Sequence, residues 1–358
     1  MKTIIYMEIK RYLQNPIFYI GAILVILGVY INVSPYLGIH YFNRESEIHT
    51  LKEHSELADA DIMDGYIPTT KEEQYEIGIH KIGQIMVDEL GYNQSQKEEL
   101  ISKLIQSNMS FMEVAEYMEA NYSFRSANTY FYDSAMKQAN VEEANDYINQ
   151  SLHKQNYSSY FSRKYTDYFS VNILFYAILM FAYLFIRDSK RDMYELLHTK
   201  PLKARDYIMG KIMGGMVALG IVVVVSTMFF DVLVMLHGKA VGFPVSFWDL
   251  WISVALLIIP NLLMVISVYT LITVLFKSPL PAVPALILYM IYSNMGTRLE
   301  NGSYGYKIRQ LAIFVRFPNI FFETAIPQQA VWNQMILLLA SVIIILLSIG
   351  IWKRRRVY

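Results

Sequence analysis

Histidine is the residue type in this chain best suited to bind a metal ion, because the chain contains no cysteine. His40, His49, His54 and His80 fall within one polar region, and His49 with Glu53 forms an i, i+4 pair on a possible helix. A zinc site would need an HExxH pattern or a second pair of ligands, and neither is present. Solvated surface histidines are therefore the better interpretation, and no metal is expected.

Nucleotide chemistry would need a phosphate-binding loop of the form GxxxxGK[ST]. The Gly-Lys pair at the start of a helix, Gly210–Lys211, has Arg205 where the first glycine should stand and Ile212 where the hydroxyl should stand. The lack of cysteine also excludes a thiol nucleophile, a cysteine zinc site and an iron–sulfur cluster. We therefore assign no catalytic residues. We expect that the chain is not an enzyme and that it binds neither a cofactor nor nucleic acid.

The composition is that of a membrane protein, since 54% of the 358 residues are apolar and 17% are charged, against about 25% charged in soluble domains. Most of the apolar stretches have the ~17–25 residues of a membrane-spanning helix. The fold class predicted is an all-α membrane protein with six transmembrane helices and a large extracellular helical domain between spans one and two. The six stretches are 17–37, 169–186, 212–236, 250–276, 280–294 and 330–352.

A cleaved signal peptide is an alternative interpretation of residues 1–37, which have a basic start and an apolar core. The apolar run is long for a signal peptide, Pro16 opens it, and no small-x-small cleavage pattern follows. We therefore expect an amphipathic elbow helix over 1–16 and the first span over 17–37.

Charge is divided unequally along the chain. The region 38–168 holds 22 acidic and 11 basic residues, a net charge of −11, so the remainder of this neutral chain carries +11. Short loops rich in Lys and Arg stay in the cytoplasm, and basic residues fill the start of the chain, the segment 187–211 and the tail 353–358. This pattern predicts a multi-pass protein of a bacterial cell membrane with both termini cytoplasmic and 38–168 outside.

The last outer loop runs against this rule because it contains four basic residues. We interpret its sequence RQLAIFVRFPNIFF, within 296–329, as a segment at the outer membrane interface, where arginines reach toward water while Phe and Ile enter lipid. Spans three to six and this segment together make up 212–352. Span five begins with three prolines and has only about fifteen apolar residues, so it should be kinked, thin the bilayer or be continued by this segment.

The outer region 38–168 has repeated helix-start patterns in which a capping side chain stands three residues before a Glu. These pairs are Thr70 with Glu73, Ser95 with Glu98, Ser110 with Glu113 and Asn140 with Glu143. Apolar residues at helical spacing follow each pair, and no stretch alternates for long enough to indicate a sheet. A small all-helical domain is therefore expected.

The segment 187–211, RDSKRDMYELLHTKPLKARDYIMGK, is predicted to form a short amphipathic helix that Pro201 ends. The order of its residues resembles the cytoplasmic segment of the type-2 ABC transporter permease family: Glu-Leu-Leu, a small polar residue, Pro-Leu, basic residues and Gly-Lys. The chain start YMEIKRYLQNPIFYI is similar to the same family's elbow helix. The resemblance covers the membrane portion, about 230 residues, whereas the first outer segment is larger than in the family's compact form.

This resemblance implies the membrane subunit of an ABC exporter. Two such permease subunits, identical or similar, would form the pathway in the lipid bilayer, and two copies of a cytoplasmic ABC ATPase would bind ATP and Mg²⁺. The residues implied to couple to the ATPase are Glu8, Arg11, Glu195, Leu196, Leu197, Pro201, Leu202 and Arg205.

Polar residues within spans are costly in hydrocarbon and often functional. Asp231 in span three and Asn261 beside Pro260 in span four are candidate pathway residues. Span four also contains the row Ser267, Thr270 and Thr273. Such a row more often marks helix packing than substrate contact. The glycines 210, 214, 215 and 220 let helices approach closely, which suits a subunit contact or a moving joint equally.

An acidic outer domain above a pathway of Met, Leu, Ile and Val should attract cationic, apolar cargo. We therefore expect export of a cationic amphipathic peptide, such as an antimicrobial peptide, with lipid-like or small hydrophobic compounds as alternatives. A sensor or scaffold whose outer domain binds a ligand is the rival function, and a membrane-embedded enzyme ranks last. The candidate capture residues are Glu72, Glu73, Glu76, Asp88 and Glu89.

Overall fold

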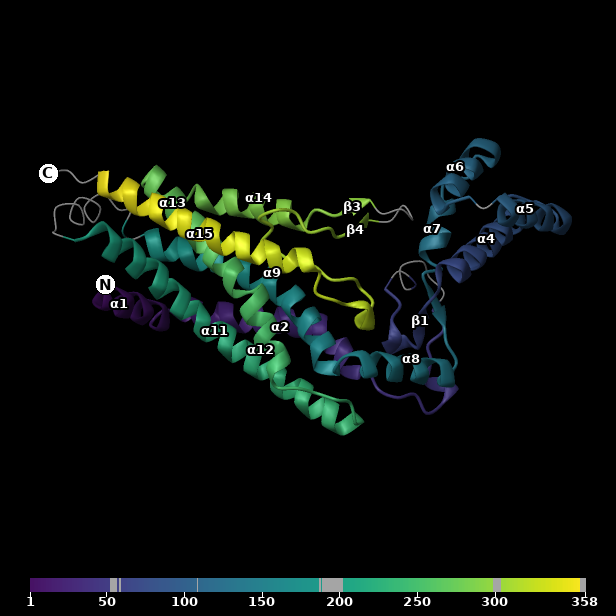
Figure 1. Ribbon diagram of the computed structural model, residues 1–358, viewed down its shortest axis with the longest axis horizontal. Coiled ribbons are helices and arrows are strands. Elements are labelled where there is room, and N and C mark those ends of the chain that lie inside the picture. The colour runs from purple at the N-terminus through teal and green to yellow at the C-terminus, as the bar shows by residue number, and fades with distance from the viewer. Residues whose placement is uncertain are drawn as a thin grey trace.

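The computed structural model describes residues 1–51, 57, 59–107, 109–186, 188, 202–298 and 304–354. It consists of a bundle of long helices from which a smaller helical part projects (Figure 1). Both chain termini lie at one end of the bundle, called here the terminal end, and the projecting part lies beyond the other, called the domain end.

Helices make up most of the described residues. They are α1 (Lys2–Leu13), α2 (Pro16–Val33), α4 (Lys71–Asp88), α5 (Gln94–Ser107), α6 (Phe111–Tyr122), α7 (Ala127–Tyr132), α8 (Val141–Lys154), α9 (Tyr157–Ile186), α11 (Ala204–Val241), α12 (Trp248–Leu257), α13 (Ile259–Phe276), α14 (Ala282–Asn294) and α15 (Gln328–Arg354). Short 3₁₀ helices are η1 (Ser34–Gly38), η2 (Glu45–Glu47), η3 (Ile62–Asp64) and η4 (Phe321–Glu323), and strands are β1 (Tyr66–Pro68), β2 (Met136–Gln138), β3 (Thr297–Arg298) and β4 (Tyr304–Gly305).

Five helical segments in the described chain are long and apolar enough to cross a membrane: Pro16–Gly38, α9, α11, α12 with α13, and α15. The sixth apolar helix, α14, has 13 residues, about 20 Å at the usual rise per residue, and is too short to cross ~30 Å of hydrocarbon alone. The antiparallel pair β3–β4 follows it. The expected fifth span is therefore a short helix continued by a hairpin.

Two spans are longer than their apolar stretches. Helix α9 begins at Tyr157 and α11 at Ala204, so the boundaries expected at 168 and 211 both fall inside continuous helices. The polar first turns of α9 are buried against other segments of the protein. Apolar composition alone does not show how far these helices continue, because their first turns are polar or aromatic and packed against protein.

Span four is divided at Ile258, between α12 and α13, directly before Pro260. The Asn261 amide donates to the Leu257 carbonyl across this break. Further along α13, the hydroxyls of the row Ser267, Thr270 and Thr273 each donate to the carbonyl four residues earlier, which is the local bonding expected of hydroxyls in a helix. The three side chains are also buried, which agrees with the helix-packing interpretation of this row.

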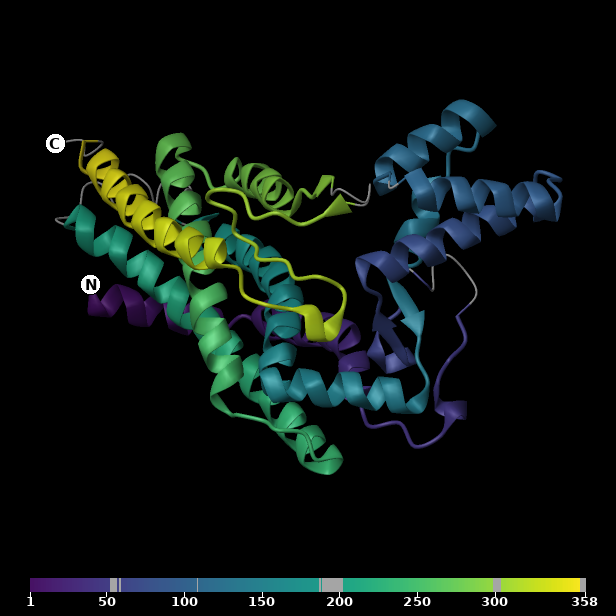
Figure 2. The ribbon, with the colours of Figure 1, turned by 45° about the vertical axis from the view of Figure 1, so that its right-hand side comes forward.

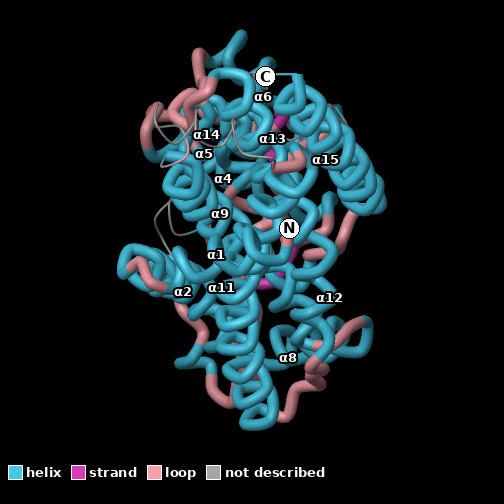
Figure 3. The backbone as a smooth tube through the Cα atoms, turned by 90° about the vertical axis from the view of Figure 1, so that its left-hand side faces the viewer, coloured by secondary structure: helices cyan, strands magenta, loops and turns pink. Residues whose placement is uncertain are grey.

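Helix α9 is the central element of the bundle, because it packs against α2, α11, α12, α13 and α14. Figure 3 looks along the bundle from the terminal end and places α2 and α15 toward opposite sides. Both of these helices are largely exposed, whereas α9 is mostly buried. Helices α2 and α15 therefore contribute much of the exposed apolar surface of the bundle.

The region 38–168 is divided between two cores. Helices α4 to α7 enclose their own core, centred on Ile79, Ile82, Leu104 and Phe131, whereas α8 and the residues around Ile39 to Ile62 pack with the bundle. The strands β1 and β2 pair in antiparallel register between these two parts (Figures 1 and 2). The expectation of an all-helical domain is wrong at this point, because three residues per strand are too few to produce a visible alternation.

Three of the four predicted capping boxes are confirmed, at Thr70 with Glu73, Ser110 with Glu113 and Asn140 with Glu143. The fourth is wrong. Helix α5 begins at Gln94, one residue before the predicted capping site Ser95, because Asn93 and Gln96 exchange the two reciprocal bonds at 2.8 and 2.9 Å. Asn93 and Gln96 have the same chemistry and spacing as the predicted pair.

The interpretation of RQLAIFVRFPNIFF as a lipid-dipping segment is also wrong. Ala312, Ile313, Phe314, Val315 and Phe317 are buried within the protein. The Asn333 amide of α15 donates to the Ala312 carbonyl at 2.7 Å, and two charged side chains of α9 bind the segment's backbone, as described below. These contacts provide hydrogen-bond partners for the backbone groups of an irregular segment that lies inside the protein rather than in lipid.

Candidate coupling site

A buried group of charges lies at the terminal end of the bundle, where α1, α9 and α11 meet. The Lys211 ammonium group is 2.8 Å from Glu8 Oε1 and 2.6 Å from Asp188 Oδ2. Lys211 is 1% exposed and Glu8 is 3% exposed. Charged side chains are rarely this inaccessible unless they are paired, so the three groups must be considered as one site, called here the coupling cluster.

Neighbouring groups complete the coupling cluster. The Tyr207 hydroxyl donates to Asp188 Oδ2 at 2.8 Å, and Arg11 donates to both oxygens of Glu8 at 2.9 and 3.1 Å. Lys211 also donates to the carbonyl of Leu184, near the end of α9, at 3.3 Å. Two carboxylates therefore meet two cations, and the cluster as a whole is neutral.

Glycines on α11 allow α1 to lie close enough for this pairing. A Cβ atom at Gly210 would lie 2.7 Å from Ile4 Cγ2, and one at Gly214 would lie 2.6 Å from Glu8 Cβ. Both distances are shorter than real Cβ contacts. The structure shows a close helix approach within one chain at Gly210 and Gly214, whereas Gly220 has open space around it. Whether these glycines also serve a subunit contact or a moving joint stays a prediction.

Helix α1 is also attached to α9, because the Tyr12 hydroxyl donates to the Met180 carbonyl at 3.1 Å. The exposed face of α1 carries Tyr6 and Met7, and its last turn carries Lys10 and Arg11. This helix therefore has one face fixed to the bundle and an opposite face with apolar and basic groups, as expected of an interfacial elbow helix.

The predicted coupling residues are only partly placed by the structure. Glu8 and Arg11 lie in the coupling cluster, while Leu202 is half-buried and Arg205 is exposed at the start of α11. The other four, Glu195, Leu196, Leu197 and Pro201, lie outside the described residues.

Sequence reasoning missed three members of the cluster: Lys211, Asp188 and Tyr207. A usable signal was present, since Lys211 stands in an otherwise apolar stretch of a spanning helix, where a charge usually needs a partner.

The candidate pathway residues do not form one site. Asp231 is buried and accepts from Trp251 Nε1 at 3.4 Å, and it lies 20 residues, about 30 Å, along α11 from Lys211. Asn261 is buried at the break between α12 and α13. No hydrogen bond joins the two side chains in the described part of the chain.

The acidic capture candidates are spread along α4. Glu72 and Glu76 are exposed near its start, while Asp88 and Glu89 are exposed at its end, about 18–24 Å away at 1.5 Å per residue. Asp88 accepts two bonds from Gln84. These four residues therefore do not form a single patch.

Glu73 has a structural role instead. Its carboxylate accepts from the Thr70 backbone at 2.8 Å and pairs with Lys137 at 2.7 Å. The hydrogen bond from Lys137, followed by that from Thr70, lowers the pKa of Glu73. Its charge is therefore already neutralised by a partner on β2.

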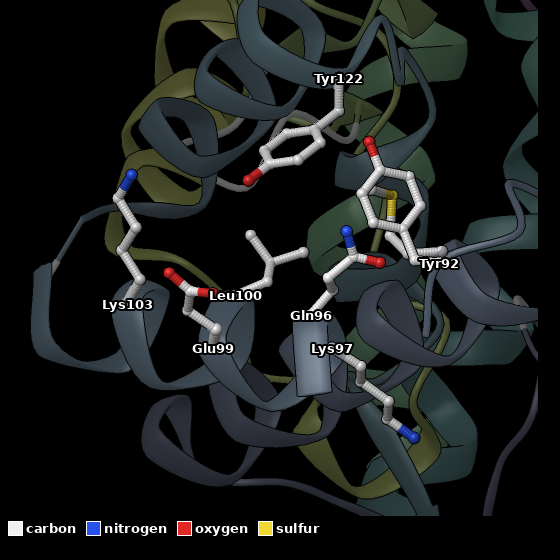
Figure 4. A pocket seen from close by; sticks show the side chains of 8 residues that line it. Tyr92, Gln96, Lys97, Glu99, Leu100, Lys103 and Tyr122 are labelled. Atoms are coloured by element: carbon white, nitrogen blue, oxygen red, sulfur yellow. The ribbon is translucent and has the colours of Figure 1, made fainter. Parts of the chain in front are cut away.

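A hollow of about 290 Å³ opens on the projecting part between the end of α4, α5 and the end of α6. The rings of Tyr92 and Tyr122 stand on one side of it, 5.9 Å apart between centroids, and Leu100 lies toward its floor (Figure 4). Glu99 and Lys103 lie at its rim, whereas Lys97 points away. The lining residues are Met86, Tyr92, Gln96, Lys97, Glu99, Leu100, Lys103 and Tyr122.

Histidines form pairs with carboxylates but no larger group. His40 lies 3.7 Å from Glu47 and His49 lies 3.4 Å from Asp64. Within the described ranges, no three His, Asp or Glu side chains are arranged to hold a metal ion. His54 and Glu53, two of the five residues considered for a metal site, lie outside these ranges.

The bundle and its buried charge cluster define the class: a helical, multi-pass membrane protein whose N-terminal helix is attached to the end of the bundle that carries both termini. More particularly, the chain belongs to the ABC-2 family transporter proteins, whose family model matches residues 3–352. No curated protein and no solved structure matches the chain. Membership makes it a permease, the membrane component of an ABC transporter, and implies an ABC ATPase as partner.

Proposed function

We propose that this chain is the permease subunit of an ATP-driven exporter in a bacterial cell membrane. It forms half of the transmembrane pathway, pairs with a second permease subunit that is identical or similar, and couples to two copies of a cytoplasmic ATPase that binds ATP and Mg²⁺. The coupling cluster is the observation that carries this proposal. It attaches α1 to the bundle beside both ends of the segment 187–211, which the family resemblance assigns to ATPase docking.

In this proposal the terminal end faces the cytoplasm and the projecting part lies outside the cell. Lys2, Lys10 and Arg11 at the chain start and Lys353 and Arg354 at the end of α15 all lie at the terminal end, as the positive-inside rule favours. Helix α14 with the β3–β4 hairpin then completes the fifth of six crossings.

The proposed cargo is a cationic amphipathic peptide. Two features support it: the net charge of −11 in 38–168, which steers cations, and the hollow that Tyr92, Glu99 and Tyr122 help to line. Tyrosine faces such as those of Tyr92 and Tyr122 attract a Lys or Arg side chain, while Leu100 and Met86 offer apolar contact. Lipid-like or small hydrophobic compounds would use neither the charge nor the tyrosine faces.

The test of the proposed function is reconstitution with the ATPase from the neighbouring reading frame. We expect Glu195→Ala or Leu196→Asp to leave membrane insertion intact while lowering ATPase co-purification or substrate-dependent ATP hydrolysis, because motion is transmitted only through connected elements. Lys239→Ala, an exposed change at the domain end of α11, is the matched control. Unchanged assembly and hydrolysis in both variants, or a neighbouring histidine kinase in place of an ATPase, would instead favour the sensor function.

A further inference from the structure

A second group of buried charges lies at the domain end of the bundle. Asp61, Lys164 and Asp167 are 2%, 1% and 3% exposed. Asp61 belongs to the base of the projecting part, just before η3, while Lys164 and Asp167 stand on α9. Such complete burial requires partners.

These partners are largely backbone groups of one irregular segment, residues 316–321. The Lys164 ammonium group donates to the carbonyls of Pro318 and Asn319, each at 2.6 Å. Asp167 accepts from the Phe317 backbone N–H at 3.0 Å and pairs with Arg316 Nε at 2.9 Å. Both side chains of α9 are therefore fixed to the same short stretch.

Asp61 binds the same segment from the other side. Its Oδ2 atom accepts from the Phe321 N–H at 2.8 Å, and its Oδ1 atom accepts from the Ile62 N–H at 2.7 Å. The Phe321 ring stacks on Tyr36 with centroids 5.2 Å apart. The base of the projecting part and α9 thus meet through residues 316–321.

At this end of the bundle, the polar contacts between α9 and α11 differ in kind. There, the Tyr165 hydroxyl lies 3.1 Å from Ser226 Oγ and 3.2 Å from Thr227 Oγ1. Neutral hydroxyls exchange partners at small cost, whereas separating a buried ion from its partner leaves an unpaired charge in a poorly solvated place. At the domain end, displacement is therefore easier between α9 and α11 than between α9 and the segment 316–321, whereas at the terminal end buried Lys211 attaches α11 to the Leu184 carbonyl of α9.

Helix α9 is continuous between the two charge groups. Lys164 and Leu184, whose carbonyl accepts from Lys211, are 20 residues apart on it, about 30 Å. We infer that α9, the segment 316–321 and Asp61 move as one rigid strut, which carries a displacement of the coupling cluster to the base of the projecting part. This inference rests on the proposed function, because the ATPase supplies the displacement.

Two distances test the strut in the full complex of permease and ATPase. The chain has no cysteine, so spin labels can be placed at Phe175→Cys with Asn319→Cys, both within the strut, and at Lys239→Cys with Asn319→Cys, across to α11. All three positions are exposed. We expect ATP binding to leave the first distance unchanged and to shift the second by several ångströms. A nucleotide-dependent change in the first distance, or no change in either, overturns the inference.

A charge variant gives an independent measurement. We expect Lys164→Met to broaden the first distance distribution several-fold and to abolish the ATP-dependent shift in the second, while ATPase co-purification is retained. The control is the exposed change Lys154→Met, which should behave as the parent protein when measured with the labels at Lys239→Cys and Asn319→Cys. Lys164→Arg, which keeps the positive charge, should restore the shift. A normal shift in Lys164→Met contradicts the inference. Loss of co-purification in the parent protein would contradict the proposed function instead.

Discussion

Lys211 lies between the carboxylates of Glu8 and Asp188 with almost no access to water. A protein with hydrophobic side chains of similar volume in place of all three ions would often be as stable as one with the ions. The cluster is therefore poorly explained as a stabilising device alone. Its placement, at the junction of three helices beside the segment 187–211, agrees better with a joint that must hold one defined arrangement.

Replacing Lys211 alone should be costly. We expect Lys211→Met to lower the free energy of unfolding by roughly 3–5 kcal/mol, because the buried Glu8 and Asp188 would lose the cation between them and retain only the bonds from Arg11 and Tyr207. Combining it with Glu8→Gln and Asp188→Asn should recover much of the loss. The measurement is equilibrium unfolding in detergent, with Lys239→Met as the exposed control on the same helix. Equal stability of the two single variants would show that the cluster is hydrated and weak.

Individual side chains were predictable from the sequence where the chemistry is local. The caps at Thr70, Ser110 and Asn140 depend on a partner three residues away, and all three form. Lys164 and Asp167 were not recognised, because their partners lie about 150 residues along the chain. Glu8 and Arg11 entered the candidate site through a family resemblance rather than through their contacts.

Helix α1 reaches the bundle only because α11 offers glycines along one face. The added Cβ at Gly214 would meet Glu8 Cβ, which belongs to the stem of that side chain and cannot rotate away. The packing of α1 is thus decided by residues that were noticed in the sequence for their spacing, whereas their partner helix could not be identified from spacing alone.

We expect Gly214→Leu to displace α1 and weaken ATPase docking. Trypsin should then cleave faster after Lys10 and Arg11 in inside-out vesicles, because a helix detached from its neighbour unfolds locally more often. Gly220→Leu, on the same helix with open space around it, is the matched control. Identical cleavage rates in the two variants would mean that α1 is held by its other contacts.

The long helices were predictable as elements because hydrophobicity reports burial in lipid. Their full lengths were not, because the residues from Tyr157 to Asp167 carry polar and aromatic side chains that are nearly all buried by protein rather than lipid-like in composition. The same cause explains the misplaced segment around Phe314 to Phe317: a run of Phe, Ile and Val looks alike whether it faces lipid or a neighbouring helix.

The arrangement of the whole molecule gives a direct test of orientation. With the terminal end in the cytoplasm, protease added to intact spheroplasts should cleave within 38–168 and leave 187–211 untouched. Inside-out vesicles should show the reverse pattern, which serves as the control for accessibility. Cleavage in 187–211 from outside would rule out the six-crossing arrangement.

The distribution of charge over the molecule gives a test of the cargo. A synthetic Lys/Leu peptide should bind the full chain in nanodiscs at least ten-fold more weakly at 1 M than at 0.1 M salt, since the screening length falls from ~10 Å to ~3 Å. Changing Asp88 and Glu89 to Asn and Gln, and separately Tyr122 to Ala, should each weaken binding. Glu73 is left unchanged because it caps α4.

A Gln/Leu peptide of the same length is the uncharged control for that measurement. Binding of both peptides with equal strength, or binding that ignores salt, would exclude electrostatic capture. Either result would favour lipid-like or small hydrophobic compounds as the cargo.

The chain enters and leaves helices α4 to α7 through two adjacent strands, β1 and β2, and the bond from the Thr69 N–H to the Ala135 carbonyl at 3.0 Å continues their ladder. Residues 69–135 therefore start and finish side by side and have a core of their own. Such a piece is an insertion in the permease scaffold: it can be lengthened, exchanged or replaced by a tight turn without changing the path of any bundle helix. Evolution can thus alter the projecting part of this permease separately from the helices of its bundle.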